Sequence, residues 1–158
     1  MTRVWRIVPR ARLTDAFTGA DAARRGARWN ARGERVVYAS SHLSLALLEL
    51  LVHVDLERLH TAHVALPIDI PSDVATHVLD AAELPDDWQR PQNQACAHAG
   101  SAWIAAGKTA ILDVPSAVIP FERNVALNPA HPDFRRLDFS HPGYPLHVDG
   151  RLVSLLSA

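Results

Sequence analysis

The sequence of 158 residues has one cysteine, one methionine and no long apolar run. A lone Cys96 cannot form a disulfide within the chain, so we expect a reducing compartment. The segment Met1 to Leu13 alternates arginines with apolar residues and lacks the apolar core of a signal peptide. The longest apolar run, Leu43 to Val54, contains Glu49 and His53 and is too short to cross a membrane. We therefore expect a cytoplasmic protein.

Neither sign of charge is in excess, because 16 Lys and Arg face 17 Asp and Glu, for a formal net charge of -1. The chain as a whole is therefore not drawn electrostatically to nucleic acids or membranes. Its length suits one substantial hydrophobic core, and we expect a single domain over residues 1–158.

Several catalytic motifs are missing from the sequence. It has no glycine-rich phosphate loop, no GxSxG elbow, no HExxH and no Cys/His spacing typical of zinc sites, although it has nine histidines. These absences disfavour a Ser-His-Asp hydrolase, and we expect no metal site. Cys96 lies on an alanine-rich segment, which favours a small core residue over a nucleophile.

The most informative stretch runs from Arg25 to Asp55. A short strand is predicted over Arg35 to Ala39, and Ser40 and Ser41 after it are typical of a helix N-cap. Apolar residues then recur with a helical period from Leu43 to Val54. The opposite face of this helix is also apolar, so the pattern predicts a helix that is buried nearly all round.

Glu49 lies on this apolar helix without an obvious partner. An ionised carboxylate is almost never fully buried unless it is paired. Glu49 therefore either pairs with a structural arginine or faces a cleft where its charge is used. A run of five arginines from Arg24 to Arg35 also has two interpretations, a solvated surface or a phosphate-contacting patch.

The remaining elements predict an α+β domain, with strands on both sides of two helices and no regular βαβ alternation. Pro67 suggests that the strand containing it is an edge strand, and Gly107 is expected to end the second helix. The expected elements are a strand Val4–Val8, a loop or irregular helix Thr14–Arg24, strands Thr61–Ile70 and Thr76–Leu79, a helix Gln92–Ala106, strands Ala110–Val114 and Ala117–Pro120, turns over Phe121–Phe139 and a terminal hairpin Leu146–Leu156.

Several short motifs, taken together and in order, resemble the RES family of toxins from bacterial RES–Xre toxin–antitoxin pairs. They are Trp-Arg-Ile-Val with Arg6, Gly-Ala-Arg-Trp-Asn at 26–30, Tyr38, Leu-Ala-Leu-Leu-Glu at 45–49, Val-Pro-Ser-Ala at 114–117, and Asn-Val-Ala-Leu-Asn-Pro-Ala-His-Pro-Asp-Phe at 124–134. The resemblance covers nearly the whole chain. It departs from the family at Ala27, where the family usually has a second glycine.

The resemblance implies an ADP-ribosyltransferase-like fold, with a split β core and a buried helix carrying Glu49. It implies a toxin that depletes NAD by cleaving the nicotinamide–ribose bond, through hydrolysis or phosphorolysis, with NAD as substrate and no further cofactor. It also implies a cognate Xre-type helix-turn-helix antitoxin, whose C-terminal region occupies the active-site cleft.

Five residues are candidates for this chemistry. Glu49 would stabilise the oxocarbenium-like transition state. Arg28 and Arg6 suit bidentate contact with the NAD pyrophosphate. Tyr38 would stack on the nicotinamide ring. Ser116 would hydrogen-bond substrate or orient Glu49, although a plain turn serine after a proline is an equal alternative.

The residue two positions before Glu49 bears on the acceptor. Arginine-modifying transferases commonly carry an acid or glutamine there, whereas this chain has Leu47, which favours water or phosphate. Two alternatives stay open: a mono-ADP-ribosyltransferase with a specific protein target, and a non-catalytic module whose arginines bind nucleic acid.

Overall fold

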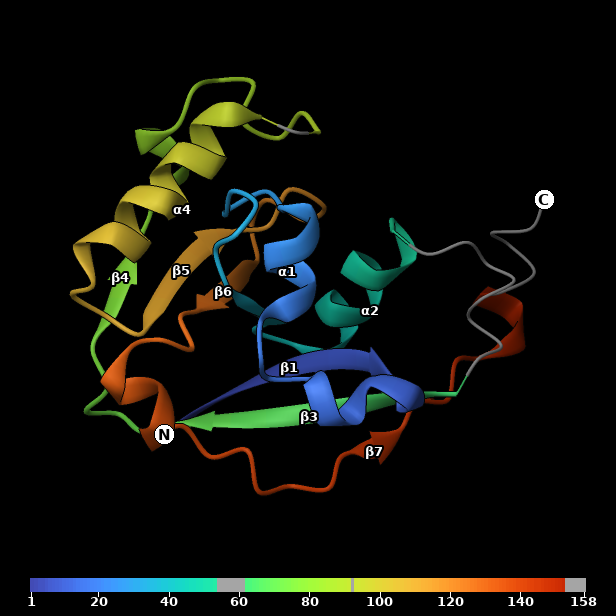
Figure 1. Ribbon diagram of the computed structural model, residues 1–158. Coiled ribbons are helices and arrows are strands. Elements are labelled where there is room, and N and C mark those ends of the chain that lie inside the picture. Colours follow the sequence, from blue (N-terminus) through green and yellow to red (C-terminus); the bar gives the residue numbers. More distant parts are fainter. Residues whose placement is uncertain (54–61, 92, 153–158) are drawn as a thin grey trace.

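A computed structural model describes residues 1–53, 62–91 and 93–152 (Figure 1). Within these residues one sheet of seven strands organises the chain, in the order β4-β5-β6-β2-β1-β3-β7. Strands β4 and β5 are parallel and the other neighbours are antiparallel. The strands are β1 Thr2–Pro9, β2 Val37–Ser40, β3 His63–Ile70, β4 Thr76–Val78, β5 Ile111–Pro115, β6 Arg123–Leu127 and β7 Tyr144–Pro145.

The sheet consists of two well-paired halves joined at one narrow point. Strands β1 and β3 pair along their whole length, and β2, β6 and β5 form the second continuous ladder. Strands β1 and β2 pair at a single register position, Trp5 opposite Ser40. The two halves therefore diverge on either side of this position.

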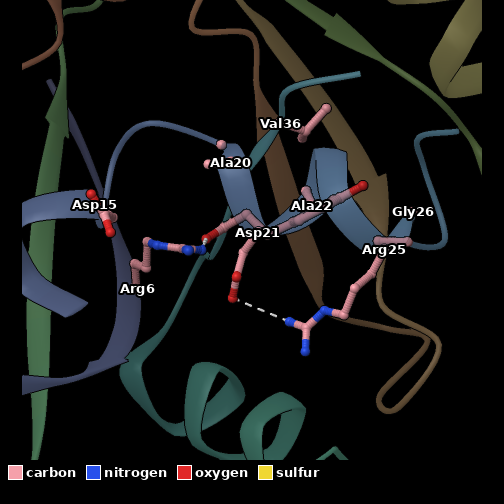
Figure 2. Close-up of a pocket in the computed structure, with 11 residues that line it drawn as sticks. Arg6, Asp15, Ala20, Asp21, Ala22, Arg25, Gly26 and Val36 are labelled. Atoms are coloured by element: carbon pink, nitrogen blue, oxygen red, sulfur yellow. Dashed lines mark hydrogen bonds and ion pairs between the residues drawn. The ribbon is translucent and has the colours of Figure 1, made fainter. Parts of the chain in front are cut away.

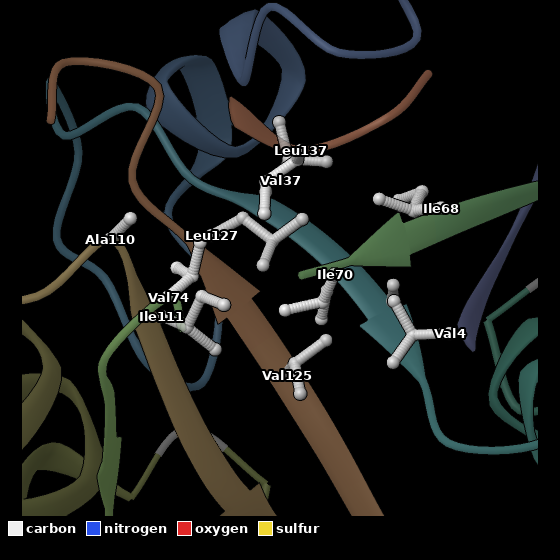
Figure 3. Close-up of a cluster of buried hydrophobic side chains, with 11 residues drawn as sticks. Val4, Val37, Ile68, Ile70, Val74, Ala110, Ile111, Val125, Leu127 and Leu137 are labelled. Atoms are coloured by element: carbon white, nitrogen blue, oxygen red, sulfur yellow. The ribbon is translucent and has the colours of Figure 1, made fainter. Parts of the chain in front are cut away.

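Alternation along the strands gives the second half an apolar core on each face. Val37 and Leu127 belong to one cluster, which Figure 3 shows converging with residues of β1 and β3. Val36 and Ala126, one position away on the same two segments, belong to the other cluster. The sheet is thus buried on both faces around β2 and β6.

Within the described residues, α-helices and short 3-10 helices accompany the sheet. Helix α4 begins after Asn93, whose side chain accepts a hydrogen bond from the Ala95 N–H at 2.9 Å, and ends at Gly107 in the left-handed region. Cys96 on α4 is buried in the second cluster, as predicted for a core residue. The helices are α1 Ala20–Arg25, α2 Leu43–Leu51, α4 Gln94–Ala106, η1 Arg10–Asp15, η2 Ala81–Glu83 and η3 Pro132–Arg136.

Helix α2 differs from its prediction in two respects. Only Leu45 and Ala46 of the helix are buried, whereas Leu48 is 39% exposed, so the expectation of a helix buried all round is wrong. The helix packs against β1 and β2, and an apolar sequence cannot show which of its side chains stay exposed. The N-cap is His42, not a serine, because Ser40 still belongs to β2. The predicted end at Val54 lies outside the described residues.

Three further predictions for the C-terminal half are wrong. No strand forms over Ala117–Pro120, and β6 occupies part of the segment interpreted as turns. The turn signals there, several asparagines, are outweighed by pairing of β6 between β2 and β5. The described part of the terminal hairpin, residues 146–152, contains no strand and becomes helical from Gly150.

Other predictions agree with the structure. The strand at β4 is present, and the segment Thr14–Arg24, predicted as a loop or irregular helix, contains the end of η1 and most of α1. The prediction that β3 is an edge strand is wrong, because β7 pairs outside it, although only with Val64 and Ala65. Pro67 therefore lies beyond this short edge strand, where its missing N–H is tolerated. Helices with a mainly antiparallel sheet agree with the α+β class. No described helix is both long and apolar enough to cross a bilayer.

Candidate functional site

Glu49 on α2 accepts two hydrogen bonds on one carboxylate oxygen. The Ser116 hydroxyl donates to Oε1 at 2.7 Å, and the Asn124 side-chain amide donates to the same oxygen at 2.5 Å. Ser116 directly follows β5 and Asn124 lies on β6, so two adjacent strands present both donors to the helix. Glu49 has no ion pair with an arginine in the described part of the chain. Its charge is therefore held by neutral donors and is not cancelled.

Ser116 makes the contacts of a turn serine and also contacts Glu49. Its buried hydroxyl accepts hydrogen bonds from the N–H groups of Val118 and Ile119, at 3.1 and 3.0 Å, as a turn serine does. The same hydroxyl donates a hydrogen bond to Glu49. The turn fixes the oxygen in place, and the donated hydrogen bond orients the carboxylate.

Sequence reasoning missed Asn124 and assigned Ser40 to a helix cap. The two residues face each other across β2 and β6, and the Ser40 hydroxyl donates to Asn124 Oδ1 at 2.7 Å. The sequence signal for Asn124 was its position directly before the apolar run Val125–Leu127. That asparagine was interpreted as part of a turn.

Arg6 lies where β1 and β2 diverge. Its Nη1 donates to the Tyr38 carbonyl at 2.8 Å, and its buried Nε has no hydrogen-bond partner among the described residues. Burial lowers the pKa of Arg6 to about 10, against a smaller opposing effect of the Asp21 charge. The guanidinium is thus a charged and incompletely satisfied group inside the protein.

The Tyr38 side chain is also fixed by a hydrogen bond. Its hydroxyl donates to Asn30 Oδ1 at 2.7 Å, and Asn30 Nδ2 donates to the carbonyls of Ala22, Ala31 and Glu34. Burial raises the pKa of Tyr38, so the phenol stays protonated at neutral pH. The ring packs against the second apolar cluster.

Arg6 and Tyr38 line a pocket of about 170 Å³ between β1, β2 and α1, shown in Figure 2. Asp21 also lines it and is surrounded by arginines: Arg12 and Arg24 donate to Oδ1, and Arg25 donates to Oδ2 at 3.2 Å. Although burial alone would raise it, these hydrogen bonds and charges lower the pKa of Asp21. The Asp21 carboxylate is therefore ionised and neutralised by its neighbours.

Arg28 makes a different set of contacts. Its Nη1 donates to the carbonyls of Trp88 and Arg90 at 2.7 and 3.0 Å, and its Nη2 donates to that of Gln89 at 3.1 Å. These bonds hold residues 88–90 against the segment containing Trp29. The contact of Arg28 with a phosphate remains a prediction.

The structure therefore brings the predicted site residues together in two groups and leaves one apart. Glu49 and Ser116 are in contact, Arg6 and Tyr38 share the pocket, and Arg28 lines neither. Across residues 1–53, 62–91 and 93–152, no three His, Cys, Asp or Glu side chains are placed to hold a metal ion.

The fold of the described residues is similar to that of a solved toxin–antitoxin structure. The M. tuberculosis MbcT-MbcA toxin-antitoxin complex contains a chain of similar fold, with a TM-score of 0.71. The match covers 98% of this chain and 88% of that one. At 18% sequence identity it supports the fold alone.

Sequence comparison gives the family. Toxin Res of Photorhabdus laumondii subsp. laumondii is 37% identical over 158 aligned positions, covering 95% of this chain and 96% of that protein. The Prs ADP-ribosylating toxin of a Sphingobium species is 38% identical over 137 positions, covering 84% and 85%. The RES domain model matches residues 3–149. The chain belongs to the RES domain family, and the resemblance predicted from its motifs is confirmed.

Proposed function

We propose that the chain is the toxin of a toxin–antitoxin pair and that it cleaves the nicotinamide–ribose bond of NAD. Family membership and the names of the relatives support the toxin class. The observation that carries the reaction is the Glu49 carboxylate, with Oε1 fixed by two neutral donors. We also propose that the two halves of the sheet correspond to the split β core of ADP-ribosyltransferases.

Cleavage of this bond builds positive charge on the ribose, as in glycoside hydrolysis. A carboxylate that is already oriented stabilises that charge without reorganising during the reaction. Ser116 and Asn124 occupy Oε1, and no described residue donates to Oε2. Oε2 is thus available for a ribose hydroxyl or for the developing cation.

Arg6 and Tyr38 would bind the substrate in the pocket that they line. The unpartnered Nε of Arg6 is a donor suited to an anionic oxygen. A pocket of about 170 Å³ is smaller than typical sites for whole ligands, so it would take only one part of NAD, such as a phosphate. Tyr38 would stack on the nicotinamide ring, and Arg28 would contact the pyrophosphate after exchanging its carbonyl partners for phosphate oxygens.

The acceptor is proposed to be water or phosphate, since Leu47 stands where an acceptor-positioning acid would be. The second candidate is transfer of ADP-ribose to a protein, and the similarity to the Prs ADP-ribosylating toxin of Sphingobium favours it. Incubation with NAD labelled in the adenylate part separates the two. Label in a small product supports the first, and label retained on protein from a bacterial lysate supports the second.

A nucleic-acid-binding role is the weakest alternative. Of the arginines between Arg24 and Arg35, Arg24 and Arg25 pair with Asp21, and Arg28 is bound to backbone carbonyls. These contacts reduce the charge available to a phosphate backbone. We propose instead a protein partner, an Xre-type antitoxin whose C-terminal region would cover the Glu49 site.

Replacement of Arg28 by lysine is expected to reduce NAD cleavage by roughly 100-fold, because an ammonium group cannot reproduce a planar fork that reaches several oxygens. The measurement is the rate of nicotinamide release beside Arg32→Lys, a matched change at an exposed arginine of the same segment. An Arg28→Lys protein that binds and cleaves NAD like the wild type would contradict a substrate role for Arg28.

Replacement of Arg6 by methionine is expected to stabilise the fold and weaken NAD binding. The lowered pKa means that burial opposes the charged form, and this cost is present at every pH below about 10. Methionine removes the cost but loses one hydrogen bond, for a net gain of about 1–2 kcal/mol. Urea unfolding at pH 7 and NAD titration measure both effects. If Arg6→Met unfolds at a lower urea concentration than the wild type, Arg6 stabilises the fold and this prediction is wrong.

A further inference from the structure

We propose that Asn124 is a positioning residue that fixes the direction of the Glu49 carboxylate, and that Ser40 fixes the direction of the Asn124 amide. The three side chains form one chain of hydrogen bonds, from the Ser40 hydroxyl to Asn124 Oδ1 and from Asn124 Nδ2 to Glu49 Oε1. The kinetic consequence rests on the proposed function, whereas the geometric consequence does not.

The direction of the Asn124 amide follows from its neighbour. An asparagine side chain presents an acceptor oxygen on one side and a donor nitrogen on the other. The Ser40 hydroxyl also accepts and donates, but here it lies 2.7 Å from Oδ1, so it donates. The Glu49 carboxylate only accepts, so Nδ2 faces α2 and donates to it at 2.5 Å, while the Ser40 hydroxyl holds Oδ1 at the other end of the amide.

Strand pairing makes this arrangement rigid. Ser40 and Asn124 are register partners in the β2–β6 ladder, and Ser40 is also the partner of Trp5 in β1. Ser40 thus stands at the only register position that joins the two halves of the sheet in the described chain. Ser40 itself is buried, with 4% exposure, which protects the hydrogen bond from competing water.

This arrangement gives the two carboxylate oxygens of Glu49 different roles: Oε1 holds the orientation and Oε2 faces the substrate. Asn124 and Ser116 approach Oε1 from β6 and from the turn after β5, so rotation of the carboxylate breaks both bonds. Ser116 alone would leave the carboxylate free to turn about a single contact. Because both donors are neutral, the carboxylate keeps its net negative charge, and Oε2 keeps its lone pairs available for the substrate.

Kinetic measurements on Asn124→Ala and Ser40→Ala test whether activity depends on the orientation of the Glu49 carboxylate. We expect Asn124→Ala to lower kcat by roughly 100-fold with KM for NAD little changed, since misdirection of the carboxylate acts on the transition state. Ser40→Ala should have a smaller effect in the same direction. Neither change should lower activity further in a Glu49→Gln background, because both act through Glu49.

Asn93→Ala is the matched control for loss of an asparagine side chain. Asn93 caps α4 and contacts Asp87, so this change should affect stability but not kcat. A fall in kcat for Asn93→Ala equal to that for Asn124→Ala would overturn the proposal. An additive loss when Asn124→Ala is combined with Glu49→Gln would also overturn it.

Crystal structures of the wild type and of Ser40→Ala and Asn124→Ala decide the geometric part without any turnover. We expect the Glu49 carboxylate to keep one orientation in the wild type and to rotate or become mixed in both variants. Unchanged orientation in the variants overturns the positioning role. A wild type that does not cleave NAD while the carboxylate turns as expected overturns the proposed function and leaves the positioning role supported.

Discussion

Replacement of Glu49 by glutamine is expected to lower the rate of NAD cleavage by about 1,000-fold while the protein stays folded. Glutamine keeps the shape, and its single oxygen still accepts the hydrogen bonds that Ser116 and Asn124 give to Oε1. Its nitrogen then stands at the position of Oε2. The change therefore removes the negative charge and places a donor where the substrate needs an acceptor.

The measurement is nicotinamide release by purified wild type and Glu49→Gln protein, with thermal unfolding of both. Glu83→Gln is the matched control, because Glu83 belongs to the capping box of η2, where its carboxylate accepts a hydrogen bond from the Asp80 N–H. Equal rates for the wild type and Glu49→Gln would contradict a catalytic role for this carboxylate.

Replacement of Gly100 by alanine is expected to destabilise the protein by about 3 kcal/mol or to prevent folding. A Cβ at Gly100 would lie 1.9 Å from the Trp29 carbonyl oxygen and 2.6 Å from its carbonyl carbon. Both contacts are with backbone, which cannot turn aside as a side chain can. Either α4 or the segment around Trp29 must move, and that segment carries Arg28 and the Asn30 that holds Tyr38.

Chemical denaturation measures this effect, with Gly150→Ala as the matched control. A Cβ at Gly150 would meet no atom of the described residues within 4 Å, and its φ is not positive, so the change should alter stability by less than about 0.5 kcal/mol. If Gly100→Ala unfolds at the same denaturant concentration as the wild type, α4 does not pack this closely on the Trp29 backbone.

The sequence predicts those parts of the fold whose signals are local. The helix α4 has a capping asparagine before it and a left-handed glycine after it. The strands β1 and β3 have clear apolar patterns and lie close to their expected bounds. The charged and aromatic site residues came from the family resemblance, since periodicity left Glu49 with two interpretations.

The remaining features depend on contacts between distant segments. Strand β6 is short and begins beside asparagine, so its pairing between β2 and β5 has no local signal. The exposed side of α2 is decided by which neighbours cover it, and no periodicity shows that. The partnership of Ser40 with Asn124 joins residues 84 positions apart and was likewise invisible in the sequence.

The most direct measurement is NAD turnover by the purified protein, free of any partner, in buffers with and without phosphate and with all products resolved. Wild type protein should consume NAD and release nicotinamide, with free ADP-ribose as the second product of hydrolysis or its phosphorylated form as that of phosphorolysis. Folded wild type protein that leaves NAD intact in both buffers, or that transfers all the ADP-ribose to protein, would contradict NAD cleavage with a small acceptor.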